Sequence, residues 1–382
     1  MITVNSKQVV DEVLCHGNPS YIPLGTYAID CDIAERILGH KTYVRDKVGT
    51  WLALQAGRRD EVVQSLKEDS VELFRKLPCI DVIIAFKEAA LLPPVNAPVP
   101  VMNKLNDTTW QAEDGTVYQI SYESNDVTIV AYPQREYSPE DFAGRDFSAP
   151  DESVYEAYDY LTAAMRGDRF LVGCAGGFEV MPMPGGMENG LALYLLEPGT
   201  IQAAIQQNVA HGRFLDRYYI RKGIDQVFVE MDPATTRAPL ISPELFRQLC
   251  LPAMKERIEH IKRFRDRVFL HSCGNTLSLM DMFIEAGVDC NQSLQTGAGM
   301  DIGVLKERYG DKMVYWGGVS VEKLIVGTPE DVRQDVRDAF GKAAHDGGFI
   351  LGPSHSIAYG TKYDNFMAMI DEHDKLKYKI GG

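Results

Sequence analysis

Two side chains that could bind a metal ion stand two residues apart, where an apolar run ends. His271 and Cys273 follow the run 268–270. Side chains at positions i and i+2 of a strand point to the same side, so an imidazole and a thiol converge there. His355 follows a second apolar run, 349–352. These three residues are suitable zinc ligands, and an open fourth position would make such a site catalytic. A buried thiol beside a hydrogen-bonded histidine is the alternative.

Two acidic residues follow another apolar run. Glu230 and Asp232 stand just after residues 226–229. We expect one of them to hydrogen-bond a substrate or to supply a proton, which makes both candidate catalytic residues. The alternative is structural, because the same carboxylates can accept hydrogen bonds from backbone amides.

Candidate substrate-binding residues follow other strands. Tyr27, Phe178 and the flap residue Trp110 could pack against an aromatic substrate, although each is as well suited to a core. Glu179 and Gln292 are the polar candidates.

The elements that must position these side chains alternate between strands and helices. Apolar runs of this length, separated by helices, predict a parallel sheet buried on both faces. Helix starts are marked by Ser242 and Thr328, each followed by a proline and an acid. Eight strands are predicted, which fit an α/β fold of the (β/α)8 or TIM-barrel type: residues 21–25, 80–86, 170–173, 226–230, 268–271, 289–293, 313–316 and 349–352.

The chain is longer than such a barrel needs. It has 382 residues, against about 250 for a typical barrel. We assign the excess to an N-terminal helical region, 1–77, which includes the first strand, and to an insertion, 91–147. Asp114-Gly115 lies between two alternating runs in this insertion, which predicts a β-hairpin flap near the barrel mouth. Residues 1–382 are thus interpreted as one barrel domain.

The composition excludes several classes of protein. The formal net charge is −15, from 39 basic and 54 acidic residues. Such a chain should not bind nucleic acid or an anionic membrane surface. No signal peptide or membrane span is apparent, and the seven cysteines show no disulfide framework. These features favour a cytoplasmic protein with reduced thiols.

Several stretches resemble the uroporphyrinogen decarboxylase superfamily, which includes cobalamin-dependent methyltransferases. The resemblance covers most of the chain and implies a (β/α)8 barrel. It is carried by PGGMENGLALYLLEP (184–198), APLISPELFRQLCLPAMKE (238–256), VFLHSCGN (268–275), FIEAGVDCNQSLQTGAGMD (283–301), WGGVSVEKLIVGTPEDVRQDV (316–336) and GGFILGPSHSI (347–357).

The resemblance implies one of two chemistries. Uroporphyrinogen decarboxylases carry an arginine-rich motif near the N-terminus that clamps porphyrin carboxylates, whereas the comparable region here, IPLGTYAIDCDIAERIL, contains only Arg36. Methyltransferases hold zinc with a His-x-Cys pair, matched by His271 and Cys273, and with a later ligand that is commonly cysteine. His355 takes that later position here, which makes the site a harder Lewis acid suited to an oxygen-bound methyl group. It also leaves open that no zinc binds.

The leading hypothesis is therefore a methyltransferase. It would move a methyl group from a small donor, foremost a methoxylated aromatic, to the cob(I)alamin of a separate corrinoid protein, with zinc as the Lewis acid. The alternatives are transfer from methylcobalamin to a thiol or to tetrahydrofolate, a decarboxylase, and a non-catalytic corrinoid-binding protein. Members of the family are often dimers, so a homodimer is possible.

Overall fold

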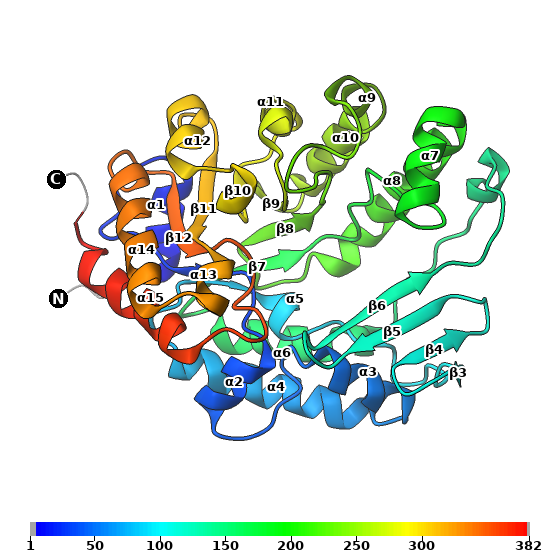
Figure 1. The fold of residues 1–382 in the computed structure, drawn as a ribbon, viewed down its shortest axis with the longest axis horizontal. Coiled ribbons are helices and arrows are strands. Elements are labelled where there is room, and N and C mark those ends of the chain that lie inside the picture. Colours follow the sequence, from blue (N-terminus) through cyan, green and yellow to red (C-terminus); the bar gives the residue numbers. More distant parts are fainter. Residues whose placement is uncertain (1–4, 380–382) are drawn as a thin grey trace.

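The computed structural model describes residues 5–379. Its main sheet is a barrel of eight parallel strands (Figure 1). The backbone N–H of Leu351 donates to the carbonyl of Pro23 at 3.0 Å, and a bridge from Leu24 to Leu351 joins the last strand to the first. The predicted (β/α)8 barrel is confirmed. The strands, in spatial order, are β1 (Gly25–Thr26), β2 (Val82–Ile84), β7 (Phe170–Cys174), β8 (Gln226–Glu230), β9 (Val268–His271), β10 (Cys290–Gln292), β11 (Val314–Val319) and β12 (Phe349–Pro353).

Helices surround this barrel and fill most of the chain between the strands. They are α1 (Ser6–Leu14), α2 (Cys31–Leu38), α3 (Lys47–Gln55), α4 (Arg59–Lys76), α5 (Ala85–Glu88), α6 (Glu156–Met165), α7 (Met187–Leu196), α8 (Pro198–Tyr219), α9 (Pro243–Leu249), α10 (Leu251–Ile261), α11 (Met280–Ala286), α12 (Ile302–Tyr309), α13 (Val321–Val326), α14 (Pro329–Ala343) and α15 (Tyr363–Leu376). No helix in residues 5–379 is long and apolar enough to cross a membrane.

The predicted helix starts are confirmed. The hydroxyl of Ser242 accepts from the N–H of Leu245 at 3.1 Å, and Thr328 forms a reciprocal capping box with Asp331. The stretch after Ser242 is nevertheless two helices, α9 and α10, which meet at Cys250. Pro252 lacks the N–H that a continuous helix would use at this point, so the helix restarts there.

The barrel interior is layered by the alternation of its strands. Phe228, Phe269 and Cys290 point inward and form a buried cluster with residues of the other strands. Because side chains alternate, the residues two positions further along point inward too. These are Glu230, His271 and Gln292, so the polar residues form the layer above the apolar one.

The opposite end of the barrel is closed by α1. Its residues Val10, Val13 and Leu14 belong to the same buried cluster as the inward side chains of the strands. This leaves the carboxyl ends of the strands as the open end, where barrel enzymes place their sites.

The insertion forms a separate antiparallel sheet, which lies well away from α1 and α15 (Figure 1). The predicted hairpin exists, with Gly115 at φ 90° in its turn. A flap of two strands was nevertheless too small a prediction, because two more strands flank the hairpin. The sheet consists of β3 (Met102–Lys104), β4 (Thr109–Ala112), β5 (Val117–Ser121) and β6 (Asp126–Ala131). β3 and the mostly exposed β6 lack the buried alternation that would reveal a strand.

Candidate active site at the carboxyl ends of the strands

The three predicted metal ligands meet in space. One donor atom from each of His271, Cys273 and His355 lies within 4.8 Å of the other two. The Sγ of Cys273 is 3.3 Å from the Nε2 of His271. The rings of His271 and His355 are 5.5 Å apart between centroids. β9 and the loop after it supply the first two residues, and the loop after β12 supplies the third.

A buried amide fixes the orientation of His271. The Oε1 of Gln292 lies beside Nδ1 of His271, and the Nε2 of Gln292 donates to the carbonyl of Pro353 at 3.5 Å. An amide oxygen only accepts, so Nδ1 carries the proton and Nε2 presents its lone pair toward Cys273. Gln292 is fully buried. The structure thus places this predicted substrate-binding residue beneath the site as a partner of His271.

The loop that carries Cys273 is held by polar contacts. Asp232 accepts from the N–H of Cys273 at 2.7 Å through Oδ1. The hydroxyl of Ser293 lies 3.4 Å from Sγ and donates to the carbonyl of Ser354 at 2.7 Å. Asp232 therefore serves as an acceptor for a backbone amide, the alternative that its sequence position left open.

The donor set suits a metal ion. Burial lowers the pKa of His271, and burial together with the nearby His271 lowers the pKa of His355 to about 4. Both imidazoles are therefore neutral at neutral pH. Burial raises the pKa of the Cys273 thiol to about 11. A divalent cation would displace that proton and hold the thiolate, and two nitrogens with one sulfur are a ligand set that zinc accepts.

A second cluster lies beside these residues. Glu230 accepts hydrogen bonds from Tyr27 at Oε1 and from Lys87 at Oε2, the latter at 2.6 Å. Burial favours the neutral form of Glu230, but the charge and hydrogen bond of Lys87 and the hydroxyl of Tyr27 outweigh it and lower the pKa. Burial, followed by the charge of Glu230, raises the pKa of Tyr27 far above its usual range. Glu230 is therefore ionised and Tyr27 is protonated.

The two clusters share one wall. The ring of Tyr27 lies 4.4 Å from that of His271 and 5.2 Å from that of His355, between centroids. The Nζ of Lys87 lies 4.9 Å from the centre of the same tyrosine ring. Tyr27 thus links the histidines to the ion pair of Lys87 and Glu230.

The other predicted substrate-binding residues lie in different parts of the structure. Phe178 is 6% exposed and belongs to the main hydrophobic core. Glu179 is exposed, and partial desolvation followed by the charge of Glu230 raises its pKa, which places it at the rim of the site. The ring of Trp110 packs on that of Trp51 of α3, with 4.9 Å between centroids, and so attaches the flap to α3.

Lys87 and Ser293 were missed as functional candidates. Lys87 lies on α5, directly after β2, so its position at a strand end was the available signal. Ser293 has a φ of 109°, and its backbone turn brings the hydroxyl to Cys273. No sequence pattern marks that conformation.

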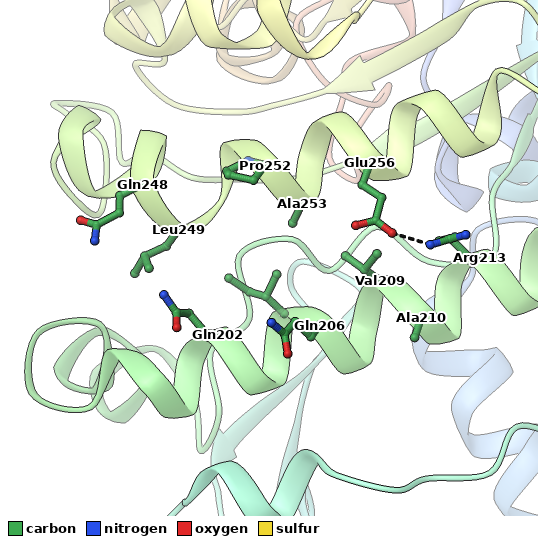
Figure 2. Close-up of a pocket in the computed structure, with 11 residues that line it drawn as sticks. Gln202, Gln206, Val209, Ala210, Arg213, Gln248, Leu249, Pro252, Ala253 and Glu256 are labelled. Carbon is green, nitrogen blue, oxygen red and sulfur yellow. Dashed lines mark hydrogen bonds and ion pairs between the residues drawn. The ribbon is translucent and has the colours of Figure 1, made fainter.

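A separate groove lies outside the barrel, between α8 and α9–α10 (Figure 2). It measures about 520 Å³ and is lined by apolar side chains and glutamines, with an ion pair between Arg213 and Glu256 at 2.5 Å. None of the candidate active-site residues lines it.

Comparison with known proteins relates the chain to methyltransferases. The curated methylated-thiol–coenzyme M methyltransferase of Methanosarcina mazei is 29% identical over 171 residues, which is 44% of this chain and 42% of the relative. The match thus spans less than half of that relative. A solved structure described as a methyltransferase from Methanosarcina mazei covers 97% of this chain and 99% of its own, with a TM-score of 0.61 and 16% identity. This likeness supports the fold.

The family comparison covers more than half of the chain. The family described as Uroporphyrinogen decarboxylase (URO-D) matches residues 118–376. These residues include the last six strands of the barrel and the three candidate metal ligands. The chain therefore belongs to the uroporphyrinogen decarboxylase family.

Proposed function

We propose that the protein is a methyltransferase that moves a methyl group from a small methoxylated aromatic donor to the corrinoid of a partner protein. The observation that carries the proposal is the convergence of His271, Cys273 and His355 within 4.8 Å at the open end of the barrel. The related thiol methyltransferase supports methyl transfer as the reaction class.

The three converging residues would hold zinc. When bound there, zinc would supply a Lewis acid for the donor oxygen, and two neutral imidazoles with one thiolate leave it a net positive charge. Gln292 keeps Nε2 of His271 free for this role, and Asp232 holds the backbone of Cys273 in place. Partners of this kind commonly matter nearly as much as the ligands themselves.

The proton requirement of the reaction points to Lys87. The bond from the methyl carbon to oxygen breaks, a bond from that carbon to cobalt forms, and the oxygen keeps the electron pair. That oxygen needs a proton to leave as an alcohol or phenol. Glu230 is ionised and has none to give, whereas Lys87 is an ammonium group. Burial lowers the pKa of Lys87, and the charge and hydrogen bond of Glu230 raise it by less. The net lowering of the pKa favours proton release.

The aromatic wall supports the choice of donor. Tyr27 stays protonated and presents its ring beside both histidines. An aromatic donor could stack there, with its oxygen directed toward the metal ligands. Stacking of this kind contributes about 0.5–1.5 kcal/mol beyond area burial.

A methylated thiol is the second candidate donor, because the curated relative is described as acting on methylated thiols. The experiment mixes the zinc-loaded protein with cob(I)alamin and a set of O-methyl and S-methyl donors, and follows methylcobalamin by its absorbance. Faster turnover of methoxylated aromatics supports the first donor class, and turnover of thioethers alone supports the second. Turnover of neither class contradicts the proposal.

A further inference from the structure

The guanidinium group of Arg45 makes a hydrogen bond through only one of its three nitrogens. Its Nε donates to Oδ1 of Asp30 at 2.9 Å, and the two side chains are 14% and 5% exposed. The terminal nitrogens, Nη1 and Nη2, find no acceptor among residues 5–379. The other oxygen of Asp30 already accepts from the N–H of Tyr359 at 3.0 Å. The terminal nitrogens of this nearly buried guanidinium are therefore free to donate to a ligand.

This guanidinium belongs to the open end of the barrel. Asp30 is three residues beyond Tyr27, and its N–H donates to the carbonyl of Ile357 at 2.9 Å, two residues beyond His355. Arg45 consequently lies within electrostatic reach of Tyr27, Lys87 and His355. It lies beside the same site, on the loop between α2 and α3.

The flap holds the loop that carries Arg45. Asn125, in the turn between β5 and β6, is 6% exposed and donates to the carbonyl of Arg45 at 3.3 Å. Its amide oxygen accepts from the N–H of Val48 at 3.1 Å. Both Arg45 and Asn125 have positive φ, 56° and 48°, which these contacts stabilise. The guanidinium is therefore preorganised.

Nearby carboxylates do not compete for this free end. Both oxygens of Glu230 are occupied by Tyr27 and Lys87. Burial raises the pKa of Glu88 to about 8, so that carboxyl group is mostly protonated at neutral pH. A planar guanidinium with two free donors matches the two oxygens of a carboxylate.

We propose that Arg45 forms a carboxylate-binding subsite, so that the methyl-bearing substrate carries one carboxylate that the terminal nitrogens of Arg45 hold. The reacting methyl group lies toward His271, Cys273 and His355. The role of the methyl group rests on the proposed function, whereas the binding of the carboxylate does not. The expected donor is therefore an acid such as a methoxybenzoate.

The test compares acids with their amides, which keep the shape and lose the charge. The probes are meta-methoxybenzoate with meta-methoxybenzamide, and (methylthio)propanoate with its amide. Their affinities for the full-length zinc-loaded protein are measured by calorimetry. We expect each acid to bind about tenfold or more tighter than its amide, because hydrogen bonds to charged groups contribute about 1.5–3 kcal/mol.

The variants separate this subsite from general charge effects. Arg45→Gln should weaken binding of the acids about tenfold to a hundredfold and leave the amides nearly unchanged. Arg213→Gln is the matched control, because it removes an arginine paired with a carboxylate in the outer groove (Figure 2). If Arg45→Gln unfolds because Asp30 loses its partner, the double variant Asp30→Asn/Arg45→Gln removes both charges and gives the same comparison.

Each outcome decides the proposal. The proposal is overturned if acids and amides bind with equal affinity, or if acid binding survives the loss of Arg45. It is also overturned if no acid binds up to about 10 mM, a concentration at which even weak millimolar complexes are detected. Arg45-dependent acid binding without methylcobalamin formation would retain the subsite and contradict the proposed function instead.

Discussion

A single buried amide decides which nitrogen of His271 faces the site. Gln292 uses its oxygen on Nδ1 and its nitrogen on the carbonyl of Pro353. The sequence could identify Gln292 as a polar residue at a strand end. It could not distinguish a substrate contact from support beneath the ligand, because that depends on the neighbouring strands.

Replacement of Gln292 by leucine should weaken zinc binding. The variant keeps the volume but loses the partner of Nδ1, so His271 can adopt the wrong tautomer. We expect zinc affinity to fall about tenfold to a hundredfold, measured by competition with a chromogenic chelator. Gln206→Leu, in the groove of Figure 2, is the control and should bind zinc normally. An unchanged affinity in Gln292→Leu would refute this role.

Glu88 should make stability depend on pH. It is 1% exposed, its Oε1 accepts from the N–H of Ile29 at 3.0 Å, and its Oε2 has no partner in the part of the chain that the structure describes. Burial raises its pKa from 4.5 to about 8. The folded state thus holds this proton more tightly than the unfolded state. The contribution of protonated Glu88 to the unfolding free energy is complete below pH 4.5 and is lost as the pH rises toward 8.

Urea denaturation at about pH 5.5 and about pH 7.5 measures this effect. The wild type should lose roughly 2 kcal/mol more unfolding free energy over this interval than Glu88→Gln, whose side chain does not titrate. Parallel losses in the two proteins would show that Glu88 is already ionised in the folded state.

At the scale of elements, a buried ion pair joins α8 and α10 to the loop after β7. Arg257 and Asp216 are 1% and 0% exposed and lie 2.7 Å apart. Arg257 also donates to the carbonyl of Gly177 at 2.8 Å, and Asp216 accepts from the N–H of Gly176 at 2.9 Å. The pair therefore sets the path of the loop that leads to Glu179.

Loss of Arg257 should be strongly destabilising. Arg257→Met leaves the buried Asp216 with His260 and the N–H of Gly176 but without its arginine, and we expect a loss of about 3–5 kcal/mol in unfolding free energy. Arg213→Met is matched to it, because Arg213 also joins α8 to α10, through Glu256, but at 44% exposure. That change should cost within about 1 kcal/mol. Similar losses in the two variants would contradict the structural role of the buried pair.

Strand ends were the part of the site that the sequence could predict. All eight predicted strands overlap strands of the barrel, although the first, 21–25, shares only Gly25 with the two-residue β1. His271, Cys273 and His355 stand at or just after the ends of these strands, so barrel geometry predicted that they could meet, and the family resemblance implied the same ligands. Lys87 directly follows the predicted strand 80–86, so its position was a usable signal, whereas Arg45 lies in a loop and no local pattern shows that it reaches the mouth.

At the scale of the whole molecule, one end of the barrel is sealed and the other is open. α1 closes the amino ends of the strands, while the flap attaches beside the carboxyl ends through Trp110 and Asn125. A net charge of −15 disfavours a donor with several negative charges, and so favours a neutral or weakly charged one. Arg45 refines that expectation, because one local cation can accommodate one carboxylate within an acidic chain.

The most direct test of the account is methylcobalamin formation by the zinc-loaded protein, the zinc-stripped protein and Cys273→Ala. Each is mixed with cob(I)alamin and a methoxylated aromatic acid, and zinc content is measured on the same samples. We predict that the zinc-loaded wild type forms methylcobalamin, that stripping abolishes this and zinc restores it, and that Cys273→Ala loses both zinc and transfer. Full transfer by Cys273→Ala, or by the stripped protein, would contradict the central claim.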